Sequence, residues 1–193
     1  MEALKDNEIF TVEAIESLPE GQRAELIDGI IYDMASPGAT HQRLVSFFDR
    51  TIGNYIEAKG GDCEVFPAPF AVYPNKDEYN YLEPDVFVVC DPSKIDEKGC
   101  HGAPDWVIEI VSPSSRTMDY LRKLFKYGKA GVREYWIVDP DKERVIVYRF
   151  GEEGQAWECD SDEKEQVEEY GFDEEIGVGI YDEDLTIRIR ETI

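Results

Sequence analysis

The stretch DWVIEIVSP, residues 105–113, places a carboxylate in the middle of an apolar run. The apolar residues on both sides of Glu109 are typical of a buried strand. Moving a carboxylate out of water costs several kcal/mol unless it is paired, hydrogen-bonded or bound to a metal. The sequence therefore predicts that Glu109 meets a cation or a hydrogen-bond donor inside the fold.

A second acid stands at the start of another apolar strand, in YLEPDVFVVC (81–90), where Asp85 follows Pro84. Proline has a fixed φ and no N–H to donate, so it suits the first residue of a strand. If the strands near 85–90 and 106–111 are neighbours, Asp85 and Glu109 converge. Two close carboxylates repel each other unless one is protonated or a cation lies between them. Such a pair of hard oxygen ligands favours Mg²⁺ or Mn²⁺.

The segment after these strands reverses the charge of the chain. Residues 116–133 carry six Lys or Arg and one acid, whereas the whole chain of 193 residues has a net charge of −23. Helical spacing predicts a helix over 117–130, ended by Gly131. Its basic stripe includes Arg122, Lys126 and Lys129, which could hold a phosphate backbone or could simply be a solvated helix face.

Lys123 lies on a different stripe of the same predicted helix. It follows Asp119 and precedes Tyr127 at intervals of four residues, so the three share one face. An exposed pair between Lys123 and Asp119 would contribute only about 0.3–0.5 kcal/mol. Spacing alone therefore indicates no more for Lys123 than an exposed ion pair with Asp119.

The remaining pattern predicts one domain of mixed elements. We expect a helix over 11–17, a hairpin around the Asp-Gly turn of 24–34, and a long helix over 40–59. Further strands are expected at 62–66, 69–74, 134–139 and 144–150, with a terminal edge strand over 185–190. This order predicts a single α/β domain, spanning residues 1–193, with helices around a mixed β-sheet.

Composition limits the other possibilities. No window reaches 18 apolar residues, and the N-terminus lacks the pattern of a signal peptide, so we expect no membrane span and a cytoplasmic protein. The four cysteines, which have no CxxC pair, are interpreted as reduced thiols, and zinc on Cys90, Cys100 and His101 is weakly indicated. The acidic segment 151–175, with twelve acids and one lysine, is either a solvated insertion or a mimic of DNA charge.

Several segments, taken in order, resemble the Uma2 family of restriction-endonuclease-like proteins. They are ELIDG (25–29), His41, PDVFVVCD (84–91), WVIEIVSPSS (106–115), the stripe Asp119, Lys123 and Tyr127, and GVREYWIVDP (131–140). The resemblance runs from about residue 20 to 150. It implies a PD-(D/E)xK nuclease core, which is a restriction-endonuclease-like mixed β-sheet flanked by helices, with a divalent-metal site.

The resemblance also implies roles for single residues. Asp85 and Glu109 match the two acids, and with the main-chain carbonyl of Ile110 they would hold Mg²⁺ or Mn²⁺. Val111 occupies the position of the usual lysine, two residues after Glu109, and Lys123 takes its place. Glu25 matches an acid of the first hairpin.

His41 matches a histidine at a helix start, although both His41 and Glu25 could instead serve as a cap or a backbone hydrogen-bond acceptor. The leading functional hypothesis is a metal-dependent endonuclease that hydrolyses DNA phosphodiester bonds. Arg122, Lys126 and Lys129 would contact the strand, and by analogy the enzyme would be a homodimer. The alternatives are a weak or inactive nuclease-fold module that binds nucleic acid or assembles with partners, and a hydrolase of another phosphate substrate.

Overall fold

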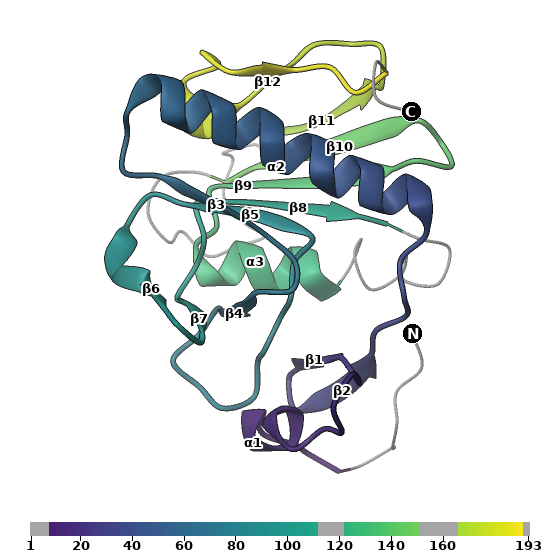
Figure 1. The fold of residues 1–193 in the computed structure, drawn as a ribbon, viewed down its shortest axis with the longest axis vertical. Helices are drawn as coiled ribbons and strands as arrows, with labels where there is room; N and C mark the ends of the chain where they lie inside the picture. Colours follow the sequence, from purple (N-terminus) through teal and green to yellow (C-terminus); the bar gives the residue numbers. More distant parts are fainter. Residues whose placement is uncertain (1–7, 112–121, 151–165, 191–193) are drawn as a thin grey trace.

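A six-stranded mixed sheet forms the centre of the computed structural model, which describes residues 8–111, 122–150 and 166–190 (Figure 1). Its strand order is β11-β10-β9-β8-β5-β3. Within it β8 and β9 pair in parallel, and the other neighbours pair antiparallel. The bounds are β3 (Glu64–Pro67), β5 (Val86–Val89), β8 (Trp106–Ile110), β9 (Glu134–Asp139), β10 (Arg144–Arg149) and β11 (Gln166–Gly171). The predicted mixed sheet is confirmed, and β5 and β8 are neighbours, which is the condition for Asp85 and Glu109 to converge.

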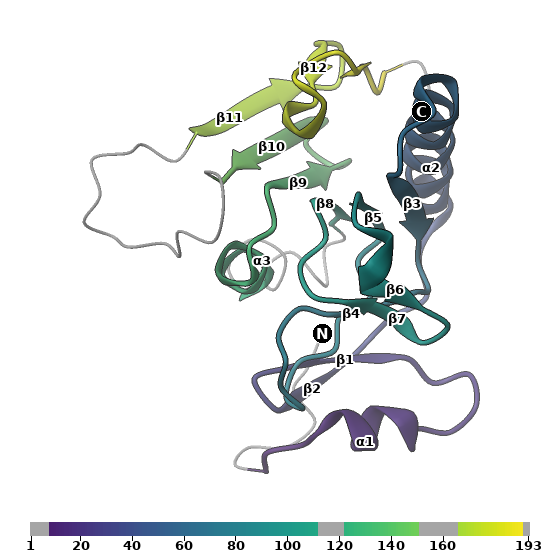
Figure 2. The ribbon, with the colours of Figure 1, turned by 90° about the vertical axis from the view of Figure 1, so that its left-hand side faces the viewer.

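Two helices cover opposite faces of this sheet (Figure 2). The long helix α2 (Ala39–Lys59) lies on one face and ends at Gly60, whose left-handed φ of 66° terminates it. The short helix α3 (Leu124–Ala130) lies on the other face and ends at Gly131 in the same way, at φ 96°. Both ends agree with the prediction, while the start of the helix expected over 117–130 lies outside the described residues.

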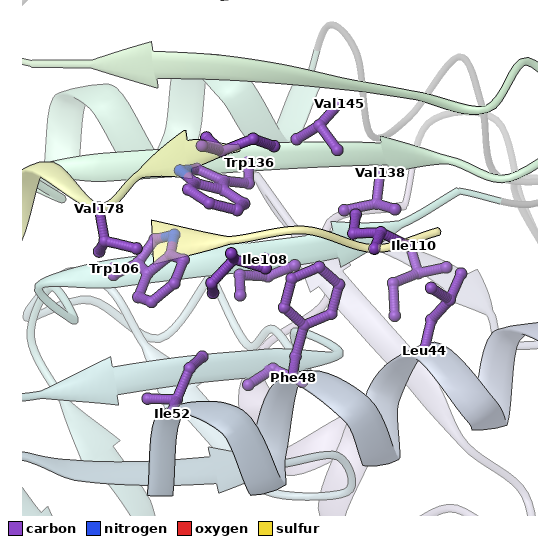
Figure 3. Packing of buried hydrophobic residues seen from close by; sticks show 14 of the residues in the cluster. Leu44, Phe48, Ile52, Trp106, Ile108, Ile110, Trp136, Val138, Val145 and Val178 are labelled. Carbon is purple, nitrogen blue, oxygen red and sulfur yellow. The ribbon is translucent and has the colours of Figure 1, made fainter. Parts of the chain in front are cut away.

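The residues of β8 alternate between these two layers. Trp106 and Ile108 pack with Phe48 of α2 and Trp136 of β9, as Figure 3 shows. Val107, which lies between them, belongs to the opposite cluster, which includes Leu124 and Tyr127 of α3. Val111, directly after the strand, belongs to the same cluster. Because side chains of a strand alternate, Glu109 lies on the α3 side of the sheet.

A third layer packs below the α3 side of the sheet (Figure 2). Its hairpin consists of β1 (Ala24–Ile27) and β2 (Ile30–Asp33), and α1 (Val12–Glu16) packs against it. The two turn residues, Asp28 and Gly29, both have positive φ, which is the conformation that an Asp-Gly hairpin turn requires. A small sheet of β4 (Ala71–Tyr73), β6 (Ile95–Asp96) and β7 (Gly99–His101) completes the layer, with the 3₁₀ turn η1 (Pro92–Lys94) beside it.

The C-terminal part returns to the α2 side of the large sheet. It contains β12 (Ile176–Gly177), the 3₁₀ turn η3 (Gly179–Tyr181) and β13 (Thr186–Ile187), and its apolar residues join the α2 cluster. The strand expected over 185–190 is shorter, and it pairs with β12 instead of forming an edge of the large sheet. That edge is β11, within the acidic segment, where Glu168 and Glu169 pair with Arg149 and Arg144 of β10. Residues 151–165 of the acidic segment lie outside the described residues.

The interpretation of all four cysteines as reduced thiols is wrong for two of them. Cys63 and Cys90 form a disulfide across a sequence separation of 27 residues. They stand one step beyond the last pair of the β3–β5 ladder, Glu64 and Val89, so antiparallel pairing brings them together. Cys100 is a buried free thiol. With Cys90 in the disulfide, the zinc arrangement weakly indicated by the sequence is excluded.

Candidate active site

The predicted catalytic residues line one cleft with a volume of about 420 Å³. It opens where β5 begins and β8 ends, between the N-terminal end of α2 and the hairpin β1–β2. Six of its lining residues were predicted from the sequence as catalytic or metal-binding, namely Glu25, His41, Asp85, Glu109, Ile110 and Lys123. Residues that are far apart in the sequence thus meet at a single place.

Asp85 and Glu109 come together through the register of the sheet. Val86 pairs with Ile108 in the antiparallel ladder of β5 and β8, so Asp85 stands one step farther along, opposite Glu109. The Asp85 carboxylate is held at both oxygens. Oδ2 accepts a hydrogen bond of 2.7 Å from the backbone N–H of Ile110, and Oδ1 lies 3.1 Å from Nε2 of His41.

Glu109, the carboxylate inside the apolar run, meets Lys123. Nζ of Lys123 lies 2.9 Å from Oε1 of Glu109 and 2.9 Å from Oε1 of Glu25, and all three side chains are buried. The hydroxyl of Tyr127 donates a further hydrogen bond of 3.1 Å to Oε1 of Glu109. Tyr127 also packs in the core cluster on the α3 side of the sheet.

Two further residues of the cleft were not predicted from the sequence. Arg23 and Glu83 form an ion pair at its wall, and Tyr81 donates a hydrogen bond of 2.8 Å to Glu83. Burial, followed by the Glu83 carboxylate, raises the pKa of Tyr81, so its hydroxyl stays protonated as the donor. The alternation of side chains along an extended chain could have identified this pair. Arg23 and Glu83 stand two residues before Glu25 and Asp85, so each points to the same side as its partner in the cleft.

Glu83 and Glu25 are also joined through the backbone. Oε1 of Glu25 accepts a hydrogen bond of 2.9 Å from the N–H of Glu83. The same oxygen faces Lys123, so Glu25 fixes the hairpin, the strand entrance and the lysine relative to one another. This is the backbone role that the sequence left open for Glu25, and it coexists with a place in the cleft.

The predicted nucleic-acid stripe of α3 lies elsewhere. Arg122, Lys126 and Lys129 are absent from the cleft lining given for the described residues. The guanidinium of Arg122 lies over the ring of Tyr32, 5.0 Å from its centroid, and contacts the hydroxyl. Lys126 pairs with Asp28 in the hairpin turn, and Lys129 is exposed. Two members of the stripe therefore fasten α3 to the hairpin, and a role in DNA binding stays a prediction.

The donor set of the cleft fits a hard divalent cation that keeps much of its water. Among the described residues, no group of three or more His, Cys, Asp and Glu forms a metal centre by itself. Mg²⁺ is commonly held by one or two carboxylates, with water completing its octahedron. Asp85, Glu109 and the carbonyl of Ile110 line one wall and supply that kind of ligand. Six acidic side chains line the cleft, together with two permanently charged cations, Arg23 and Lys123. This excess of negative charge favours the binding of a cation there.

Comparison with known proteins identifies the family and the fold. An uncharacterized protein of Synechocystis is 26% identical over 134 residues, which is 69% of this chain and 69% of that protein. The crystal structure of a "putative nuclease" from Anabaena variabilis has the same fold, with a TM-score of 0.72 and 23% identity over 95% of this chain and 97% of that chain. The described part of the chain has no helix that is long and apolar enough to cross a membrane. The family model of Uma2, described as "Putative restriction endonuclease", matches residues 11–175, and the chain thus belongs to the Uma2 family.

Proposed function

We propose that this protein is a metal-dependent endonuclease that hydrolyses phosphodiester bonds of DNA. The observation that carries the proposal is the meeting of Asp85, Glu109 and Lys123 in one cleft, with Nζ of Lys123 2.9 Å from Glu109. Two carboxylates and an ammonium group, brought together in one cleft, can support phosphodiester hydrolysis with a divalent cation.

Asp85, Glu109 and the carbonyl of Ile110 would hold Mg²⁺ or Mn²⁺. When bound, such an ion lowers the pKa of a coordinated water and stabilises negative charge on phosphate oxygens. The protein positions the ligands in advance, because the N–H of Ile110 and the ring of His41 fix both oxygens of Asp85. Tyr127 and Lys123 do the same for Oε1 of Glu109.

Lys123 has a second role in this proposal. Its ammonium group orients the attacking water or neutralises the charge that develops on the phosphate oxygens in the transition state. Glu25 keeps the ammonium group at the cleft by accepting from the same Nζ. Glu25 is therefore a positioning residue, and so is His41 through its contact with Asp85.

A weak or inactive nuclease-fold module is the second candidate, and one observation favours it. Lys123 already faces two carboxylates in a buried cluster, while Val111 stands where a strand lysine would be. A buried cluster of this kind could have a structural role alone. Such a module could still bind nucleic acid or assemble with partners.

Cleavage of supercoiled plasmid DNA in the presence of Mg²⁺ tests the proposal. We expect the wild-type protein to nick or linearise the plasmid, and Asp85→Asn and Glu109→Gln to abolish this activity. Asp96→Asn, which changes an exposed acid of β6, is the matched control and should cut like the wild type. Cutting that survives both cleft substitutions would place the chemistry elsewhere.

Titration calorimetry with Mn²⁺ separates the two candidates. An enzyme should bind Mn²⁺ in a manner that Asp85→Asn weakens, whereas an inactive module should show no carboxylate-dependent affinity. Adding mononucleotides to the plasmid reaction tests for a smaller phosphate substrate. A cleft that is specific for DNA should be inhibited little, whereas a cleft that binds mononucleotides should be inhibited strongly.

The homodimer stays a prediction, and light scattering across a range of protein concentrations would check it.

A further inference from the structure

We infer that the exposed face of the first three turns of α2 is the track that carries the phosphate backbone of the nucleic acid to the cleft. This inference rests on the proposed function, and it assigns a binding role to residues outside the catalytic cluster. The face consists of Gln42, Arg43, Ser46 and Arg50, named here the α2 track.

The α2 track is a hollowed surface and continues into the cleft. Its four side chains line a shallow depression of about 280 Å³, and all four residues are exposed. Gln42 lines this depression and the cleft, and its neighbour His41 contacts Asp85. A strand lying along the track would therefore arrive beside the proposed metal ligands.

The charges of the track are available for a ligand. Within the described residues, neither Arg43 nor Arg50 forms an ion pair with a carboxylate, and Arg50 donates to the carbonyl of Ser46 in its own helix, at 3.0 Å. The other described arginines are engaged. Six of them pair with acids, namely Arg23, Arg133, Arg144, Arg149, Arg188 and Arg190, and Arg122 contacts Tyr32. In a chain of net charge −23, two unpaired arginines on one helix face stand out.

The dimensions and chemistry of the track suit a phosphate backbone. Arg43 and Arg50 are seven residues apart, so they are separated by about 10 Å along the helix axis, which is about three nucleotide steps of 3.4 Å. Arginine, glutamine and serine side chains are common donors to phosphate oxygens, and such contacts position a duplex without reading its sequence. Asp49 stands seven residues after Gln42, on the same side of the helix, but it is half-buried and does not line the depression.

The alternative track, the basic stripe of α3, is on the opposite side of the sheet (Figure 2). Arg122 and Lys126 of that stripe are held by Tyr32 and Asp28, so a phosphate would have to displace these partners. The α2 track needs no such displacement. We prefer α2 because its arginines have no carboxylate partners among the described residues, whereas two basic residues of the α3 stripe have partners.

The test measures binding of the full chain to a short fluorescent DNA duplex across a series of salt concentrations. Each lost phosphate contact should reduce the slope of log K against log salt by about 0.9. For Arg43→Gln/Arg50→Gln we therefore expect a slope lower by about two and weaker binding at low salt. Lys126→Gln/Lys129→Gln is the competing variant, and Arg188→Gln/Arg190→Gln is the control for loss of two charges elsewhere.

An unchanged slope and affinity in the α2 variant would overturn the inference, as would a wild-type protein that does not bind the duplex. A loss no larger than that of the Arg188→Gln/Arg190→Gln control would also overturn it. Hydrolysis of the small diester bis(p-nitrophenyl) phosphate with Mn²⁺ is the separate readout of the cleft, and the α2 variant should retain it. If no variant or wild-type protein hydrolyses the diester, the proposed enzyme activity fails, while the binding slopes still decide whether the track exists.

Discussion

Lys123 and Glu109 lie 2.9 Å apart, between Nζ and Oε1, although they belong to different elements on the two sides of a strand-to-helix connection. This contact explains how an apolar strand tolerates a carboxylate at its centre. Glu109 gains a cation and, through Tyr127, a hydroxyl donor in place of the water that it loses. The buried pair links the stability of the fold to the proposed chemistry.

Replacing Lys123 should destabilise the protein more than replacing its neighbour on α3. We expect Lys123→Met to lower the free energy of unfolding by about 3–5 kcal/mol, because Glu109 and Glu25 would remain buried without their cation. Lys126→Met is the control, since its partner Asp28 is exposed and such a pair contributes about 1 kcal/mol or less. Urea unfolding followed by circular dichroism gives both values, and equal losses would contradict the assignment.

Moving the lysine back to the strand should rescue part of the activity. Val111 directly follows β8 and packs on the α3 side, so a lysine at 111 would project toward the same side as Glu109. We expect Lys123→Met to reduce plasmid cleavage by about a hundredfold. The variant Val111→Lys/Lys123→Met should recover part of this loss.

The rescue is measured at matched protein concentration, with melting curves to confirm that both variants are folded. Val111→Met/Lys123→Met is the control for added bulk at position 111, and it should stay as inactive as the single variant. If Val111→Lys/Lys123→Met is folded but recovers no activity, a lysine at position 111 cannot replace Lys123. The expectation of rescue would then be wrong.

The disulfide should contribute a measurable part of the stability. Joining Cys63 to Cys90 restricts the unfolded chain, and cross-links of this loop length typically contribute about 2–4 kcal/mol. We expect Cys63→Ser/Cys90→Ser to unfold at lower urea concentration than the wild type under oxidising conditions. Adding a reductant should destabilise the wild type toward that variant and leave the variant itself unchanged. Equal midpoints for the two oxidised proteins would contradict the expectation.

The C-terminal turn should show a pH-dependent contribution through Asp184. Hydrogen bonds from Lys59 and Tyr55 of α2 hold the pKa of this carboxyl below its usual range. A lowered pKa in the folded state means stabilisation above the unfolded value of about 4, lost as the pH falls through the folded value. Asp184→Asn should therefore melt at lower temperature than the wild type at pH 7, and the difference should shrink below about pH 4. Glu57→Gln, at an exposed position of α2, is the control for the loss of one acidic side chain.

Local patterns predicted the elements around the site well. The alternation of β8, the proline before β5 and the glycines after both helices are properties of a few consecutive residues. Asp85 and Glu109 could be placed together because both stand on strongly apolar strands, which have few options other than the centre of a sheet. The expectation that Lys123 faces the acids followed from the family resemblance, because helical spacing alone placed it only beside Asp119 and Tyr127.

Features that depend on the order of strands could not be read in this way. Cys63 and Cys90 are adjacent only because β3 and β5 pair, and Arg23 reaches Glu83 only because the hairpin packs beside the start of β5. The strand β11 was hidden by its own glutamates, which are tolerated because they pair with arginines of β10. Likewise, the basic residues of α3 gave no sign that Tyr32 and Asp28 would engage two of them.

The placement of the lysine on α3, apart from the strands that carry both acids, has an evolutionary consequence. Successive residues of a helix differ by about 100° in direction, so moving the lysine by one position along the helix would turn the ammonium group away from Glu109. The pairing of β5 with β8 would keep both carboxylates where they are. Relatives could therefore differ in the position of this ammonium group while both carboxylates keep their places in the sheet.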